Sequence, residues 1–126
     1  MAFEQWIGVD LDGTLAMYAS DPSWDYDKEL PPIGPPIVPM LTRVKQWLSE
    51  GKTVKILTAR ASHKNKKEVQ KVKDWCRQYV GQELDVTATK SPQFVEIWDD
   101  RAVQVIPNTG MRADGSGDIS SVEHYL

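Results

Sequence analysis

Apolar residues along this chain fall into short runs that polar loops separate. The first run, residues 3–9 (FEQWIGV), is rich in aromatic and β-branched residues, which is typical of a β-strand. Similar runs later in the chain predict four more strands, at residues 53–57 (TVKIL), 85–89 (DVTAT), 95–98 (VEIW) and 102–106 (AVQVI). The pattern therefore predicts five strands.

Two stretches between these strands carry apolar residues at helical spacing. The expected apolar face of the first helix consists of Ile37, Leu41, Val44 and Leu48. Gly51 follows as a C-terminal stop. The second helix is expected to open at Asn65-x-x-Glu68, which resembles a capping box, and to end near Gly81. Its expected inner face consists of Val69, Val72, Cys76 and Tyr79.

The order of these elements predicts the fold class. Strands that alternate with helices favour an α/β domain, here a Rossmann-like three-layer sandwich with a mainly parallel five-stranded sheet. Residues 17–36 carry five prolines and predict a loop or flap, and the polar residues 108–126 predict an irregular tail. The length of 126 residues fits one domain, residues 1–126.

Composition and charge exclude several classes of protein. The net charge of −3 argues against a generally basic nucleic-acid binder, so no stable nucleic-acid complex is expected. Cys76 is the only cysteine, which excludes an internal disulfide and favours a reducing compartment. We expect no membrane span and no signal peptide, and hence a cytoplasmic protein.

Polar side chains follow the predicted strands at the points where each strand ends. Because ligands of parallel α/β sheets bind at the carboxyl ends of the strands, these groups are expected to meet at one edge. They are Asp10 and Asp12, Thr58 and Arg60, Lys90, and Asp99 and Asp100. Clustered carboxylates need a cation, and hard oxygen donors favour Mg²⁺, while the hydroxyl and the basic groups suit a phosphate. The set predicts phosphoryl transfer.

Two simpler explanations of Asp10 and Asp12 compete with this one. A D-x-D-G sequence opens some calcium-binding loops, but such a loop needs Gly at its sixth position and Glu at its twelfth. Counted from Asp10, these positions hold Leu15 and Asp21, which excludes the calcium loop. The second explanation is an ordinary turn, since Asp and Gly favour turns. The polar groups after the other strands argue against the turn, which stays open as an alternative.

The motifs at these strand ends resemble those of a known superfamily. Asp10-Leu11-Asp12-Gly13-Thr14-Leu15 is similar to the first signature of the haloacid dehalogenase (HAD) superfamily of Mg²⁺-dependent phosphatases. Thr58 in KILT, Lys90 in ATKSP and the acidic pair Asp99-Asp100 in IWDD resemble its other three signatures. The stretches T-A-R, K-S-P and D-D-R-A further resemble small capless members, often encoded by phages, and the phosphatase part of phage polynucleotide kinase.

The resemblance implies a role for each residue. Asp10 would be the nucleophile that forms an aspartyl-phosphate, and Asp12 would donate and accept the proton. Mg²⁺ would be held by Asp10, by Asp12 through its backbone carbonyl, and by Asp100 or Asp99. The phosphoryl group and the rest of the substrate would contact Gly13, Thr58, Ala59, Arg60 and Lys90. The chain would thus be a capless phosphomonoester hydrolase.

Several points stay open at this level. Only eight residues separate Lys90 from Asp99, whereas a parallel crossover normally needs a dozen or more, so Lys90 is the least secure member of the set. Arg60 fits a surface ion pair as well as a substrate contact. An open site favours a phosphorylated small molecule, a nucleotide or a polynucleotide end as substrate, or closure by a second subunit of a homo-oligomer. A non-catalytic phosphate-binding or phosphoacceptor domain is the alternative function.

Overall fold

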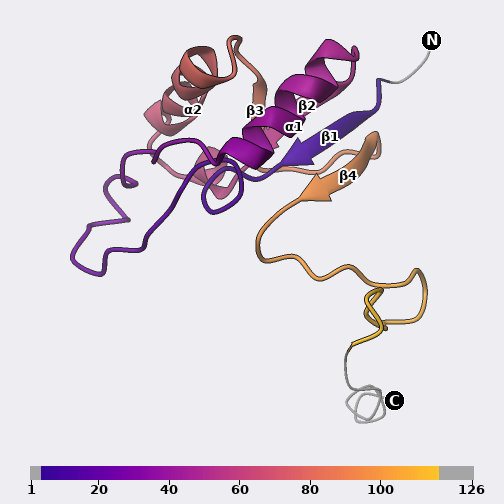
Figure 1. The fold of residues 1–126 in the computed structure, drawn as a ribbon. Helices are drawn as coiled ribbons and strands as arrows, with labels where there is room; N and C mark the ends of the chain where they lie inside the picture. The colour runs from indigo at the N-terminus through magenta and orange to yellow at the C-terminus, as the bar shows by residue number, and fades with distance from the viewer. Residues whose placement is uncertain (1–3, 117–126) are drawn as a thin grey trace.

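The computed structural model describes residues 4–116, which form one parallel sheet with two helices (Figure 1). The strands are β1 (Trp6–Val9), β2 (Thr53–Leu57), β3 (Asp85–Thr87) and β4 (Phe94–Trp98), in the spatial order β3-β2-β1-β4. All neighbouring strands pair in parallel. The helices are α1 (Val38–Ser49) and α2 (Lys67–Tyr79), and a short 3-10 helix, η1 (Ala59–Ser62), follows β2. The expected α/β class with a parallel, Rossmann-like sheet is confirmed.

Both helices pack against the same face of the sheet. Ile7 and Val9 of β1 lie in register with Val54 and Ile56 of β2, so these four side chains share one face. They belong to one buried core with residues of both helices, namely Met40, Val44, Val72, Trp75 and Cys76. Right-handed crossovers that progress in one direction, from β1 to β2 to β3, place successive helices on one side. The expected sandwich with helices on both faces is therefore wrong for residues 4–116.

The other face is covered by the connection between β3 and β4. Residues 88–93 cross from one edge of the sheet to the other without a helix. Trp6 lies on this face, outside the main core, and its indole N–H donates to the Ser91 hydroxyl at 2.7 Å. The Trp6 ring also lies 5.8 Å from the Phe94 ring. A short segment and two aromatic rings thus replace the expected helical layer.

The expected fifth strand at residues 102–106 does not join the sheet, which has four strands. After Asp100 the chain leaves the sheet and runs out as an extended arm (Figure 1). It reverses near Asn108, whose φ is +67°, so that Val105 forms an isolated antiparallel bridge with Arg112. Turn chemistry in Pro107-Asn108-Thr109-Gly110 thus pairs this alternating segment with its own continuation. Of the tail expected at residues 108–126, the part from residue 117 lies outside the described residues.

The start of α2 also differs from the expectation. The Asn65 side chain accepts from the backbone N–H of Lys67 at 3.0 Å, but Glu68 does not return a bond to Asn65. The Glu68 side chain is fully buried and faces Arg60 and Lys71 instead. The expected capping box is therefore wrong, because a buried arginine competes for its carboxylate.

Residues 17–36 form a long irregular loop between β1 and α1. The loop is tied at its ends by the bridge between Ala16 and Pro36, and the Trp75 indole N–H of α2 donates to the Gly34 carbonyl at 2.9 Å. Within residues 4–116, neither helix is long and apolar enough to cross a membrane.

Candidate functional site

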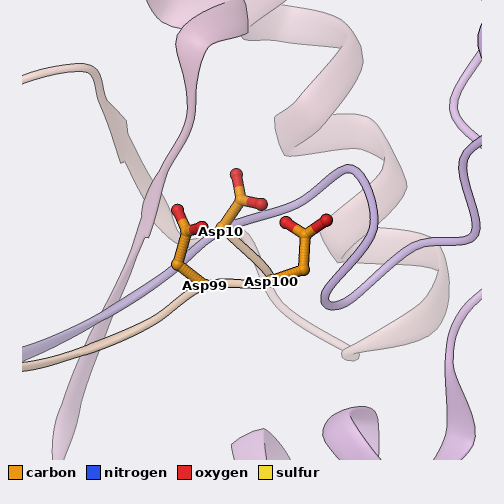
Figure 2. A group of neighbouring side chains, drawn as sticks. All are labelled: Asp10, Asp99 and Asp100. Atoms are coloured by element: carbon orange, nitrogen blue, oxygen red, sulfur yellow. The ribbon is translucent and has the colours of Figure 1, made fainter. Parts of the chain in front are cut away.

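The carboxyl ends of β1 and β4 bring three aspartates together. Asp10 follows β1, and Asp99 and Asp100 follow the neighbouring β4. Each offers a carboxylate oxygen, and these oxygens all lie within 4.8 Å of one another (Figure 2). The position fits the binding rule for open α/β sheets, because β1 is where the connections change direction, toward β2 on one side and β4 on the other. The acidic convergence predicted for this edge is thus present, as a triad.

The turn after β1 is held rigidly by its own backbone and by two leucines. The Leu11 carbonyl accepts from the N–H groups of Thr14, Leu15 and Ala16, at 2.8–3.2 Å. Leu11 and Leu15 are fully buried and anchor the turn in the core. The Thr14 hydroxyl lies 3.3 Å from an Asp10 oxygen and 3.4 Å from an Asp100 oxygen. Thr14 thus links the carboxylates that follow β1 and β4.

Gly13 is required at its position for two independent reasons. Its φ of +90° disfavours any side chain, and a Cβ there would lie 2.5 Å from Oδ2 of Asp100. The sequence predicted a close approach of the backbone at Gly13 to a substrate. In the structure the group that approaches this closely is the carboxylate of Asp100.

Substitution of Gly13 by alanine should therefore displace Asp100 from the triad. We expect Gly13→Ala to cost about 1–2 kcal/mol of unfolding free energy through backbone strain, and to weaken Mg²⁺ binding as well. Gly51→Ala is the matched control, because Gly51 has a φ of +80° but a Cβ there would meet no atom within 4 Å. Urea unfolding and Mg²⁺ titration compare the two variants. Equal Mg²⁺ affinity in both would contradict the displacement of Asp100.

The pKa of Asp10 is raised from its ordinary value of 3.8 to about 7. Burial of the carboxyl group is the largest cause, followed by the negative charge of Asp99 and a hydrogen bond with Asp100. A divalent cation between the three groups would offset this repulsion, and oxygen ligands of this type suit Mg²⁺. The residues present therefore fit the predicted metal.

The stability of the metal-free protein should depend on pH through Asp10. The folded chain keeps a proton on Asp10 that the unfolded chain releases above pH 3.8, so the stabilisation from this group is lost as pH rises toward about 7. Mg²⁺ should offset that loss, and should therefore raise Tm more at about pH 8 than at about pH 5.

Thermal unfolding at both pH values, with NaCl at matched ionic strength as control, measures this difference. At a Mg²⁺ concentration about tenfold above Kd, binding adds about 1.4 kcal/mol, or about 5 °C in a domain of this size. The same increase in Tm at both pH values would show that Mg²⁺ does not bind at Asp10.

Asp12 lies outside the triad and pairs with Arg60. Nε and Nη2 of Arg60 donate to the two Asp12 oxygens at 2.8 and 2.9 Å. Arg60 is only 3% exposed, which differs from the surface ion pair that the sequence suggested, and its contact with a substrate stays a prediction. Its third nitrogen, Nη1, faces Glu68 at 3.5 Å. Arg60 therefore orients a carboxylate of the protein, and a metal contact of Asp12 through its carbonyl stays a prediction.

Thr58 and Ala59 lie where β2 ends. The Thr58 hydroxyl accepts from the Arg60 N–H at 3.2 Å and caps η1, and Thr58 is buried. Both residues line a pocket of about 880 Å³ together with Asp10, Asp12 and Asp99. The hydroxyl proton of Thr58 stays available for a group in this pocket.

The far wall of this pocket is formed by the loop 17–36. Tyr18, Tyr26, Leu30 and Pro31 line it from the loop, opposite residues of η1. His63 ties the two walls together, because its Nδ1 accepts from the Asn65 N–H at 2.9 Å and its Nε2 lies 2.8 Å from the Tyr26 carbonyl. The acceptor role of Nδ1 leaves the proton on Nε2, which donates to Tyr26. The loop is thus fastened beside the carboxylates.

Lys90 is placed away from the carboxylates. It is exposed, its ammonium lies 5.5 Å from the centre of the Phe94 ring, and it does not line the pocket described above. The cause is the short connection between β3 and β4. Lys90 already lies where this connection runs back to the start of β4, away from the carboxyl ends of the strands. Cations that do line the pocket are Arg60, Lys64 and Arg101.

Three features of the site were not assigned from the sequence. The contact of Thr14 with both acids had a signal, because Thr14 follows Gly13 directly in the first motif. The burial of Glu68 had no signal in the sequence, since the spacing of Glu68 from Asn65 matched a capping box. The tyrosines of the loop were visible only as aromatic residues in a proline-rich segment.

No family model, no curated protein and no solved structure matches the chain in the comparisons that we made. What the site can do therefore follows from its own residues. They form a carboxylate triad at the carboxyl edge of a parallel sheet, a second carboxylate gripped by a buried arginine, and a pocket lined by both.

Proposed function

We propose that this chain is a Mg²⁺-dependent phosphomonoester hydrolase of the HAD type that acts through an aspartyl-phosphate. The observation that carries the proposal is the division of four aspartates at one sheet edge. Three carboxylates form the triad, and the fourth, that of Asp12, accepts two hydrogen bonds from Arg60. A nucleophile beside a metal and a separate acid–base group are what the two steps of such a hydrolysis need.

Asp10 would attack phosphorus with one carboxylate oxygen. The bond to the ester oxygen breaks with its electron pair, and the leaving oxygen takes a proton from Asp12. Asp12 then removes a proton from a water molecule that attacks the aspartyl-phosphate, which releases phosphate and restores Asp10. Each Asp12 oxygen keeps a lone pair besides the one that accepts from Arg60, so the proton has a place on this carboxylate.

Mg²⁺ would be held by oxygens of Asp10, Asp99 and Asp100, and when bound it would neutralise charge on the phosphoryl oxygens. The chain supplies the other contacts. The Thr58 hydroxyl would donate to a phosphoryl oxygen in the pocket that Thr58 lines. Thr14 holds the Asp10 and Asp100 carboxylates in a common orientation.

The lining of the pocket favours substrates whose leaving group carries a planar ring. Tyr18 and Tyr26 supply aromatic surface on the loop side, and Arg101 supplies positive charge, whereas Lys64 is paired with Asp27 at 3.0 Å. Nucleotides and phosphorylated oligonucleotide ends carry a ring that can stack on these tyrosines, and the oligonucleotides also carry a second anionic group. We therefore propose nucleotide-related phosphomonoesters as the substrate class.

Release of inorganic phosphate tests the proposal. The purified chain is assayed with an aryl phosphate, nucleoside monophosphates, sugar phosphates, and oligonucleotides phosphorylated at the 3′ or 5′ end, with Mg²⁺ and with EDTA. We expect Mg²⁺-dependent release that is fastest with the nucleotide-related esters. No release from any of these esters would refute the enzymatic function and leave a phosphate-binding domain as the alternative.

A further inference from the structure

A buried carboxylate lies next to Arg60, on the helix that packs beside the site. Glu68, in the first turn of α2, is 0% exposed. Its Oε1 lies 3.5 Å from Nη1 of Arg60, the nitrogen that Asp12 does not use. Its Oε2 accepts no hydrogen bond among the described residues, although the Lys71 ammonium lies 3.1 Å away. Glu68 is thus a buried charge whose contacts are charge pairs.

Stability of the fold does not explain a carboxylate at this position. Burial of a charge costs several kcal/mol, and the pairing that follows returns this cost only when the geometry is very good. The contact between Oε1 of Glu68 and Nη1 of Arg60 is long, at 3.5 Å, and Oε2 of Glu68 accepts no hydrogen bond among the described residues, so the geometry of this pair is not very good. An apolar residue would continue the buried face of Val72, Trp75 and Cys76 at lower cost. The carboxylate therefore points to a role beyond folding.

We infer that Glu68 is a positioning residue for the Asp12 carboxylate and acts through Arg60. Arg60 reaches Asp12 through two nitrogens only when its guanidinium plane has one orientation, and the negative charge of Glu68 beside Nη1 favours that orientation. This inference rests on the proposed function for its effect on catalysis. The orientation of Arg60 itself does not depend on that function.

The same carboxylate connects the site to the loop 17–36. Lys71 pairs with Glu68 at 3.1 Å and with Glu29 of the loop at 2.7 Å. Charges therefore alternate in sign from the site to the loop: Asp12, Arg60, Glu68, Lys71 and Glu29. Glu68 stands at the centre of this series, so its charge is balanced from both sides.

Glu68→Gln tests the inference, because it removes the charge and keeps the shape. We expect kcat to fall about tenfold to a hundredfold while KM changes by less than about threefold, as is usual when a partner behind a functional group is lost. Asp74→Asn is the matched control, since Asp74 lies on the same helix and is exposed. Glu68→Asp, which shortens the reach, takes the place of Glu68→Gln if that variant does not fold.

A double-mutant cycle separates action through Arg60 from a merely structural role. Arg60→Lys keeps the charge but loses the planar two-point contact. If Glu68 acts through Arg60, Glu68→Gln should reduce kcat much less in the Arg60→Lys background than in the wild type. The same factor in both backgrounds would overturn the inference, and so would an unchanged kcat in a folded Glu68→Gln protein.

Hydrogen exchange at Arg60 gives a measurement that needs no activity. The Nε–H of Arg60 is buried and donates to Asp12, so it should exchange slowly in the wild type and in Asp74→Asn. We expect at least about tenfold faster exchange in Glu68→Gln. Unchanged exchange would refute the inference whether or not the chain is an enzyme. Faster exchange in a protein that releases no phosphate would support the positioning of Arg60 and refute only the proposed function.

Discussion

Replacement of Asp10 by asparagine should abolish phosphate release. The amide has no anionic oxygen with which to attack phosphorus, and it weakens the triad as a cation site. We expect kcat to fall about a thousandfold or more, because a nucleophile contributes to every turnover. The measurement is Mg²⁺-dependent phosphate release from the best substrate of the panel.

The Asp10→Asn experiment includes a test of folding and a control variant. Folding should be unharmed, because a carboxyl group whose pKa is raised by burial and by Asp99 is replaced with a neutral one. Asp85→Asn is the control, since Asp85 is exposed at the start of β3, the end of that strand remote from the site. Activity of Asp10→Asn within about tenfold of the wild type would mean that another group attacks phosphorus.

Replacement of Arg60 by alanine should cause the largest loss of stability. Arg60 is 3% exposed and faces two carboxylates, of which Glu68 is fully buried and Asp12 is 22% exposed. Its removal leaves Asp12 without its partner and the buried Glu68 with Lys71 alone, and breaking a buried pair typically costs about 3–5 kcal/mol. Urea unfolding measures the free-energy change.

Arg77→Ala provides the comparison for Arg60→Ala. Arg77 also faces two carboxylates, Asp74 and Glu83, but all three side chains are exposed. Exposed pairs of this kind contribute about 0–1 kcal/mol. A loss of less than about 1 kcal/mol in Arg60→Ala would show that Arg60 is not buried between charges as described.

The acidic edge could be predicted from the sequence because it depends on topology alone. Parallel strands end at the same edge, so the acids that follow the apolar runs IGV and EIW must meet once both runs belong to one sheet. No knowledge of side-chain contacts was needed to place Asp10, Asp99 and Asp100 together, and to place Thr58 beside them.

The predictions from the sequence were wrong where a residue or segment matched a local pattern but has a different partner or position in the structure. The alternating residues 102–106 read as a strand, but the turn at Asn108 pairs them with residues 111–113 instead of β4. Lys90 matched a motif by order along the chain, but the short connection carries it away from the site. Glu68 matched a capping box by spacing, but it pairs with a buried arginine.

The partners of Arg60 show the limit of sequence patterns most clearly. Nothing in the spacing of residues 12, 60 and 68 relates them, because their contacts form only when the turn, η1 and α2 pack together. Charged residues are rarely buried, so a pattern assigns Arg60 and Glu68 to the surface. Long-range packing, not local preference, decides which charges become internal.

Trapping of the covalent intermediate is the sharpest test of the proposed chemistry. The protein is mixed with Mg²⁺ and its best substrate, quenched in acid during turnover, and digested for mass spectrometry. We expect one phosphoryl group, acid-stable and labile in base, on the carboxylate of Asp10, and none without Mg²⁺ or in Asp10→Asn. Phosphate release without any phosphorylated protein, or with the phosphoryl group on another residue, would contradict the role of Asp10 as nucleophile.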